Sequence, residues 1–96
     1  MKILIVEDDQ NIREGVAGFL SEFGYTTIEA ADGREGLEKF GEHDINLAIL
    51  DIQMPHLNGL EVLKEIRKSS KLPVLMLTAF SDEEYKIDAY TSLADG

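Results

Sequence analysis

Acidic residues stand at the ends of two mainly apolar runs in this sequence. Glu7 and Asp8 come directly after the run at residues 3–6, and Asp51 comes directly after the run at residues 46–50. If both runs are neighbouring strands of one parallel sheet, the three carboxylates converge beyond the carboxyl ends of those strands. Like charges only a few Å apart raise one another's pKa or require a cation. The sequence therefore predicts that a cation binds at this edge of the sheet.

The residue types available as ligands favour a hard cation. The sequence has no cysteine, and its two histidines, His43 and His56, are not spaced as a ligand pair. Oxygen ligands suit Mg²⁺ or Ca²⁺, and the spacing of an EF-hand loop is absent. Because Mg²⁺ usually takes one or two carboxylates together with water and a phosphate, the sparse acidic set fits Mg²⁺ better than a complete calcium cage.

Several of these polar residues also have a purely structural interpretation. Asp9 is placed to cap a helix that begins near Gln10. Thr78 follows the apolar run at residues 73–77, and because threonine is common in strands, its chemistry alone leaves a functional and a structural role equally open. The structural interpretation is weaker for Asp8 and Asp51, since an isolated carboxylate at the end of a buried strand needs a partner. We assign no catalytic role to either histidine.

The elements that must position these residues follow from the hydrophobic pattern. Four short apolar runs alternate with four segments of helical spacing, which predicts a parallel sheet with right-handed crossovers. The expected strands are 3–6, 25–30, 46–50 and 73–77. The expected helices are 10–23 with Gly24 as its stop, 33–40, a helix capped by Asn58, and a last helix from Ser81 to about Leu93.

Composition narrows the class of protein. The chain has 96 residues, of which 44% are hydrophobic and 29% are charged, as expected for one small domain with a core. The formal net charge of −10 argues against direct binding to nucleic acids or to anionic membranes. No apolar run approaches the length of a membrane span, and the absence of cysteine is compatible with the cytoplasm, where we expect the protein.

Three segments taken together resemble the receiver domains of two-component response regulators. They are Ile3 to Asp9, Leu50 to Pro55 with Asn58 and Gly59, and Pro73 to Ala79. The resemblance runs from Met1 to Gly96 without a gap. It implies an α/β fold, namely a flavodoxin-like doubly wound parallel sheet with strand order 2-1-3-4 for the part present.

The resemblance also implies a role for each residue of the predicted site. By this resemblance, Asp51 is the phosphoacceptor. Asp8 would bind Mg²⁺ directly, Glu7 would reach the ion through water, and the backbone carbonyl of Gln53 would be the third protein ligand. The hydroxyl of Thr78 would sense the phosphoryl group, and Ala79 would be the small residue beside it.

The sequence departs from the family pattern at its end. The family has a fifth strand that carries a phosphate-contacting lysine, and this chain stops at Gly96, where that strand should begin. The resemblance therefore implies a receiver domain over residues 1–96 that lacks the fifth strand and last helix. An apolar strand left at a sheet edge is a template for association, so we expect this chain to self-associate, with a marginal monomer as the alternative.

The function implied is acceptance of a phosphoryl group on Asp51, with Mg²⁺, from a sensor histidine kinase. The resulting change of conformation would control an output, such as a DNA-binding effector domain after residue 96. The domain would catalyse only its own phosphorylation and dephosphorylation. The alternative kept open is a receiver-like interaction module that works without phosphorylation.

Two other classes of protein fit less well. A hydrolase of the dehalogenase-like class needs a second aspartate two residues after the first, where this chain has Gln53. A flavodoxin-type FMN binder needs a loop that holds phosphate after the first strand, and the acidic residues 7–9 would repel phosphate.

Overall fold

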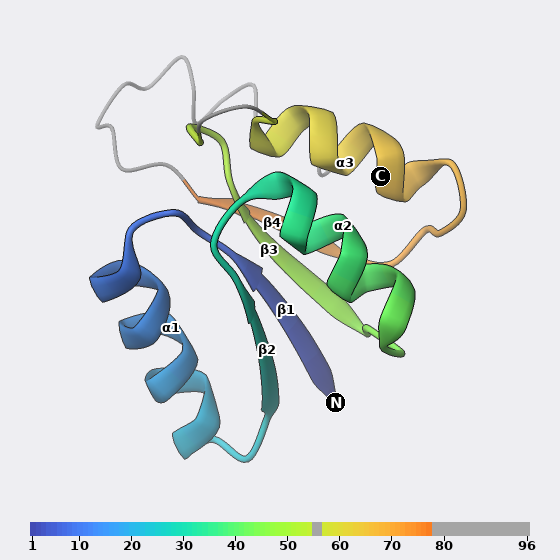
Figure 1. Cartoon of the computed structure of the whole chain (residues 1–96). Helices are drawn as coiled ribbons and strands as arrows, with labels where there is room; N and C mark the ends of the chain where they lie inside the picture. Colours follow the sequence, from blue (N-terminus) through green and yellow to red (C-terminus); the bar gives the residue numbers. More distant parts are fainter. Residues whose placement is uncertain (55–56, 78–96) are drawn as a thin grey trace.

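A computed structural model describes residues 1–54 and 57–77 of the chain (Figure 1). The elements in chain order are β1 (Lys2–Val6), α1 (Gln10–Glu22), β2 (Thr26–Ala30), α2 (Gly33–Glu42), β3 (Leu47–Asp51), α3 (Gly59–Arg67) and β4 (Val74–Leu77). The four strands form one parallel sheet in the order β2-β1-β3-β4, which confirms the expected α/β architecture. Thr78, His56 and the expected last helix lie outside the described residues.

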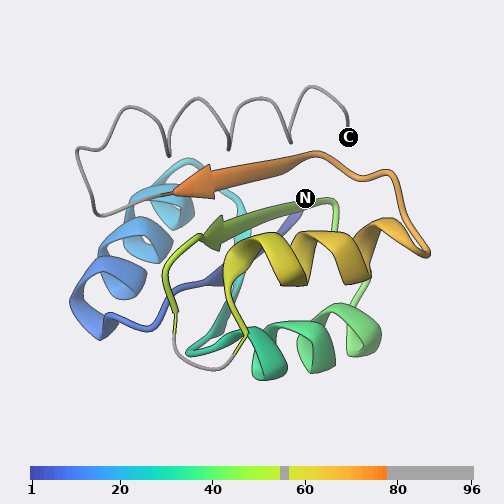
Figure 2. The same ribbon diagram turned by 90° about the horizontal axis from the view of Figure 1, so that it is seen from above.

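Helices cover the sheet on both faces. Figures 1 and 2 show α1 on one face and α2 beside α3 on the other. Because side chains alternate across a strand, β1 sends Leu4 and Val6 toward α2 and α3, and Ile3 and Ile5 toward α1. All four of these side chains are buried, as their continuous apolar run predicts for a central strand.

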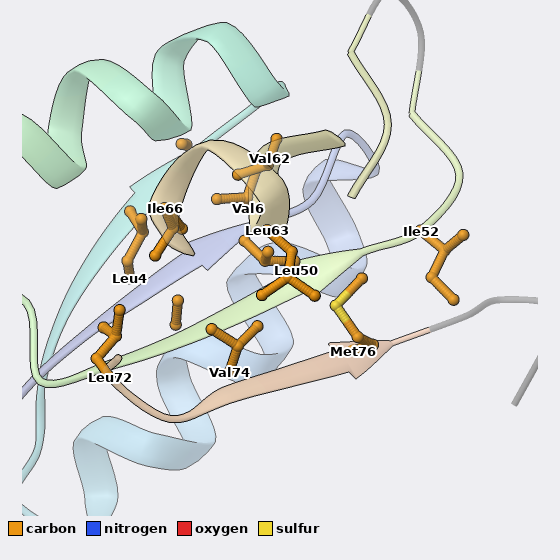
Figure 3. Packing of buried hydrophobic residues seen from close by; sticks show 12 residues of the cluster. Leu4, Val6, Leu50, Ile52, Val62, Leu63, Ile66, Leu72, Val74 and Met76 are labelled. Atoms are coloured by element: carbon orange, nitrogen blue, oxygen red, sulfur yellow. The ribbon is translucent and has the colours of Figure 1, made fainter. Parts of the chain in front are cut away.

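The larger core lies under α2 and α3. In Figure 3 the side chains of this cluster converge from β1, β3, β4 and α3. The fully or nearly buried members that the figure labels are Leu4, Val6, Leu50, Ile52, Val62, Leu63, Ile66, Leu72, Val74 and Met76. This packing fixes α3 against the sheet.

The edge strand β4 is buried on one face and partly exposed on the other. Val74 and Met76 are buried in the larger core, but Leu75 is 47% exposed on the other face. Phe19 and Phe23 of the α1 segment are also exposed, and their rings pack against each other with centroids 5.1 Å apart. Helical spacing thus predicted α1 correctly, but not which of its apolar residues reach the sheet.

The ends of the elements shift by one or two residues for identifiable reasons. Helix α1 ends at Glu22 because Gly24, with φ of 88°, turns the chain into the left-handed region. Strand β3 includes Asp51, which lies opposite Leu77 of β4 in the ladder. The segment Leu47–Asp51 therefore carries the predicted acceptor as its last residue, and not as the first residue of a loop.

Helix α2 approaches β1 so closely that only a glycine fits at one position. A Cβ atom added to Gly36 would lie 2.7 Å from Cγ2 of Val6, which is fully buried. We expect Gly36→Ala to destabilise the fold by about 1–3 kcal/mol through overpacking. The matched control is Gly15→Ala in α1, where nothing lies within 4 Å, and where alanine should stabilise the helix by up to about 1 kcal/mol. Urea unfolding of both variants measures the difference, and equal effects of the two substitutions would contradict the packing argument.

Candidate functional site

The candidate site is built by the pairing of β1 with β3. Val6 of β1 lies opposite Leu50 of β3, so the residues that follow, Glu7 and Asp51, emerge side by side at the carboxyl edge of the sheet. Carboxylate oxygens of Glu7, Asp8 and Asp51 all lie within 4.8 Å of one another. The convergence predicted from the sequence is therefore confirmed.

The three acidic side chains differ in burial. Glu7 is 4% exposed and Asp51 is 3% exposed, and Asp8 is exposed. The site thus has two carboxylates inside the protein and one at its mouth, which leaves an approach from solvent on the side of Asp8.

Backbone amides hold the two buried carboxylates in place. The amide of Asp9 donates to Oε1 of Glu7 at 3.0 Å, and the amide of Gln53 donates to Oδ1 of Asp51 at 3.2 Å. Asp9 itself accepts a hydrogen bond from the amide of Ile12 at 3.0 Å, so it caps α1 and its structural interpretation is confirmed. Of the three consecutive acidic residues, two serve the cluster and one starts the helix.

The start of α3 is packed directly against the end of β3. The amide of Gly59 donates to the carbonyl of Ile52 at 3.1 Å, and a Cβ atom at Gly59 would collide with the carbonyl of Asp51. The preceding Asn58 caps the helix by accepting from the amide of Glu61 at 3.0 Å, as predicted. This close approach fixes the backbone on which the Asp51 side chain stands.

Burial changes the protonation of the two inner acids. Burial, together with the negative charge of Asp51, raises the pKa of Glu7 to about 7, against the opposing effect of the hydrogen bond from the Asp9 amide. Burial also raises the pKa of Asp51, against the hydrogen bonds from Glu7 and from the amide of Gln53. Without a cation, the pair therefore tends to hold a proton near neutral pH, and a bound cation would take the place of that proton.

The other residues singled out in the sequence lie as follows. Gln53 is exposed just after β3, two residues beyond Asp51. His43 ends α2 at the opposite edge of the sheet, where its amide donates to the carbonyl of Lys39, so it takes no part in the site. Thr78 lies outside the described residues, and its predicted role stays a prediction.

One residue of the site was missed in the sequence. Nη1 of Arg13 donates to the carbonyl oxygen of Glu7 at 2.9 Å, and its Nε pairs with Oε1 of Glu29 on β2 at 3.3 Å. The only sequence signal was a basic residue one helical turn after the Asp9 cap. That signal does not indicate which backbone group the side chain reaches.

No helix within residues 1–54 and 57–77 has the length and apolar character needed to cross a membrane.

The raised pKa values give a test of the site without metal. A carboxyl group whose pKa is higher in the folded than in the unfolded state stabilises the fold below its unfolded pKa, and this contribution is lost as pH rises through the folded value. We therefore expect metal-free Asp51→Asn to be more stable than the unmodified chain at about pH 8, by the order of 1 kcal/mol, and this advantage to be smaller at about pH 5. Asparagine keeps the acceptor for the Gln53 amide.

Urea unfolding in the presence of a chelator measures this difference at the two pH values. The matched control is Asp44→Asn, which removes an exposed carboxylate at the opposite edge of the sheet and should show no such dependence. A stability difference of Asp51→Asn that is the same at both pH values would contradict the assignment.

Comparison with known proteins gives one consistent family. The sequence pattern described as the response regulator receiver domain matches residues 3–96. Response regulator RR06 of Streptococcus pneumoniae is 46% identical over 95 residues, and regulatory protein VanRB of Enterococcus faecalis is 44% identical over 95 residues. The aligned part is 99% of this chain in both cases, but 44% of the first relative and 43% of the second, so the chain spans less than half of their length.

A solved structure agrees with these relatives. Response regulator TrrA of Thermotoga maritima, in complex with Mg²⁺ and BeF, superposes with a TM-score of 0.85 at 43% identity, covering 95% of this chain and 79% of that one. Sequence pattern, relatives and fold coincide. The chain therefore belongs to the response regulator receiver domains, which are signalling domains of two-component systems and not enzymes of the ordinary kind.

Proposed function

We propose that this chain accepts a phosphoryl group on Asp51 from a phosphohistidine of a sensor histidine kinase, with Mg²⁺ bound beside it. The observation that carries the proposal is the meeting of Glu7, Asp8 and Asp51 at the carboxyl edge of the sheet, two of them almost fully buried. Burying two carboxylates together is unfavourable without a cation or a proton between them. A bound Mg²⁺ would supply that cation, and the proposed phosphoacceptor function would explain why the carboxylates lie together.

The donor set fits Mg²⁺. The side chains of Glu7, Asp8 and Asp51, together with the backbone carbonyl of Gln53, would supply oxygen ligands only, and too few of them to fill a coordination shell. A site of this kind leaves positions for water and for phosphoryl oxygens. When bound, the ion would offset the negative charge of the two approaching anions.

The transfer itself is a displacement at phosphorus. An oxygen of the Asp51 carboxylate forms the new bond to phosphorus, the bond from phosphorus to the kinase histidine breaks, and the imidazole nitrogen keeps the electron pair. The product is an acyl phosphate, whose hydrolysis returns Asp51 to its carboxylate form. In the proposal, the hydroxyl of Thr78 responds to the new phosphoryl group and passes the change to an output.

The proposed partners follow from the same chemistry. The relatives are regulators more than twice as long as this chain, so we propose an output domain, such as a DNA-binding effector, as the recipient of the signal. With a formal net charge of −10, the domain itself is a poor partner for nucleic acid phosphates. A cytoplasmic location is part of this proposal. A receiver-like interaction module without phosphorylation is the alternative that the experiments below distinguish.

Metal binding is tested by thermal unfolding. We expect Mg²⁺ to raise the melting temperature, because a ligand at ten times its Kd stabilises the fold by about 1.4 kcal/mol. Asp8→Asn should abolish the rise, and Asp44→Asn, with the same change of charge at the opposite edge, should keep it. An equal response of both variants to Mg²⁺ would place the ion elsewhere.

Phosphorylation is tested with phosphoramidate, whose phosphorus–nitrogen bond resembles that of phosphohistidine. With Mg²⁺ present, we expect a mass gain of about 80 Da, the mass of one phosphoryl group. The group should be lost on treatment with hydroxylamine, which attacks acyl phosphates. Asp51→Asn should abolish the gain while leaving the fold intact, and Asp44→Asn should not. Modification of a serine or threonine would refute the assignment of Asp51, and absence of any gain would favour the interaction module.

A further inference from the structure

Arg13 links the acidic cluster to the neighbouring strand through the backbone. Its side chain is only 15% exposed, and it makes two contacts on different elements. Nη1 donates to the carbonyl oxygen of Glu7 at 2.9 Å, and Nε lies 3.3 Å from Oε1 of Glu29 on β2. The guanidinium therefore bridges the backbone just after β1 and the strand β2.

The contact with Glu7 has a geometric consequence for Asp8. The carbonyl of Glu7 and the amide of Asp8 belong to one planar peptide, so fixing the carbonyl also fixes the plane from which Asp8 departs. On its other side, the amide of Glu7 donates to the carbonyl of Ala30 at 3.1 Å. The backbone of Glu7 is thus hydrogen-bonded at both its donor and its acceptor, and the second bond depends on Arg13 alone among the contacts of the described residues.

We propose that Arg13 is a positioning residue of the metal site, which presets the Glu7–Asp8 peptide so that both carboxylates face Asp51 and a cation between them. Glu29 holds the guanidinium in the orientation that reaches the Glu7 carbonyl. The inference rests on the proposed function of the site, because the cation it concerns is the Mg²⁺ of that function.

Charge and position predict opposite effects for Arg13, and this makes the inference testable. As a charge alone, a guanidinium bonded to the Glu7 carbonyl repels a cation bound at the cluster, so its removal would strengthen Mg²⁺ binding. As a positioning group, its removal frees the peptide and weakens binding. If Arg13 formed only a surface ion pair with no further role, its removal would leave Mg²⁺ binding unchanged, since such pairs contribute little.

The experiment measures the Kd for Mg²⁺ by following the NMR signals of backbone amides during titration, well below the melting temperature of each variant. We expect Arg13→Met to raise the Kd by about tenfold, in the range found for residues that orient metal ligands. Arg13→Lys keeps the charge but can reach only one of the two groups, the Glu7 carbonyl or Glu29. Its Kd should therefore lie between that of the unmodified chain and that of Arg13→Met. Glu29→Ala should also raise the Kd for Mg²⁺, but by less than Arg13→Met does.

A control variant and a second measurement separate this role from a general effect on charge or stability. Lys68→Met removes one positive charge and an exposed ion pair with Glu65 on α3, away from the site, and should leave the Kd unchanged. Hydrogen exchange of the Asp9 amide, which is bound to the Glu7 side chain, should become faster in Arg13→Met without Mg²⁺ and stay unchanged in Lys68→Met.

The outcomes distinguish this inference from the proposed function. If the unmodified chain shows no Mg²⁺ response at Asp8 and Asp51, both fail. If it binds Mg²⁺ there, and Arg13→Met binds the ion equally well or more tightly, only the positioning role of Arg13 is overturned. A Kd for Arg13→Lys equal to that of the unmodified chain would overturn the part assigned to Glu29, because a single hydrogen bond to the Glu7 carbonyl would then be enough.

Discussion

The register between β1 and β3 is the constraint on which the site depends. With Val6 opposite Leu50, the chain must place Glu7 and Asp51 next to each other at one edge of the sheet. A shift of one strand by a single residue would turn every side chain to the other face and separate the acids. The register is held by apolar packing on both faces, since β1 and β3 are the two central strands. The core therefore serves the site by fixing the register of β1 relative to β3.

The acidic cluster opposes the stability that the core provides. Two buried carboxylates with raised pKa values disfavour the folded state at neutral pH, and the surrounding structure must compensate. Backbone amides of Asp9 and Gln53 supply part of this compensation, and the close approach of Gly59 holds the backbone of Asp51 and Ile52 at the end of β3. The local geometry thus retains an arrangement that the electrostatics alone would disperse.

Features encoded by neighbouring residues could be predicted from the sequence. The strands, the Asp9 and Asn58 caps, and the stop at Gly24 depend on spacing within a few positions, and the order of parallel strands followed from the family resemblance. Arg13 could not be assigned, because its partners are a backbone carbonyl and a residue 16 positions away. The exposure of Leu75 could not be assigned either, since a continuous apolar run does not say which face of an edge strand is covered.

Parallel topology gives the molecule an electrostatic direction. Each of β1, β2 and β3 ends at the same edge, so α1, α2 and α3 all begin there, and their amino-terminal ends each carry about half a positive elementary charge. The edge that collects the acids is therefore also the edge toward which three helix dipoles point. A fold with antiparallel strands would have sent some of these dipoles to the opposite edge. The same connectivity that crowds the carboxylates together thus supplies a fixed field that makes further negative charge at this edge less unfavourable.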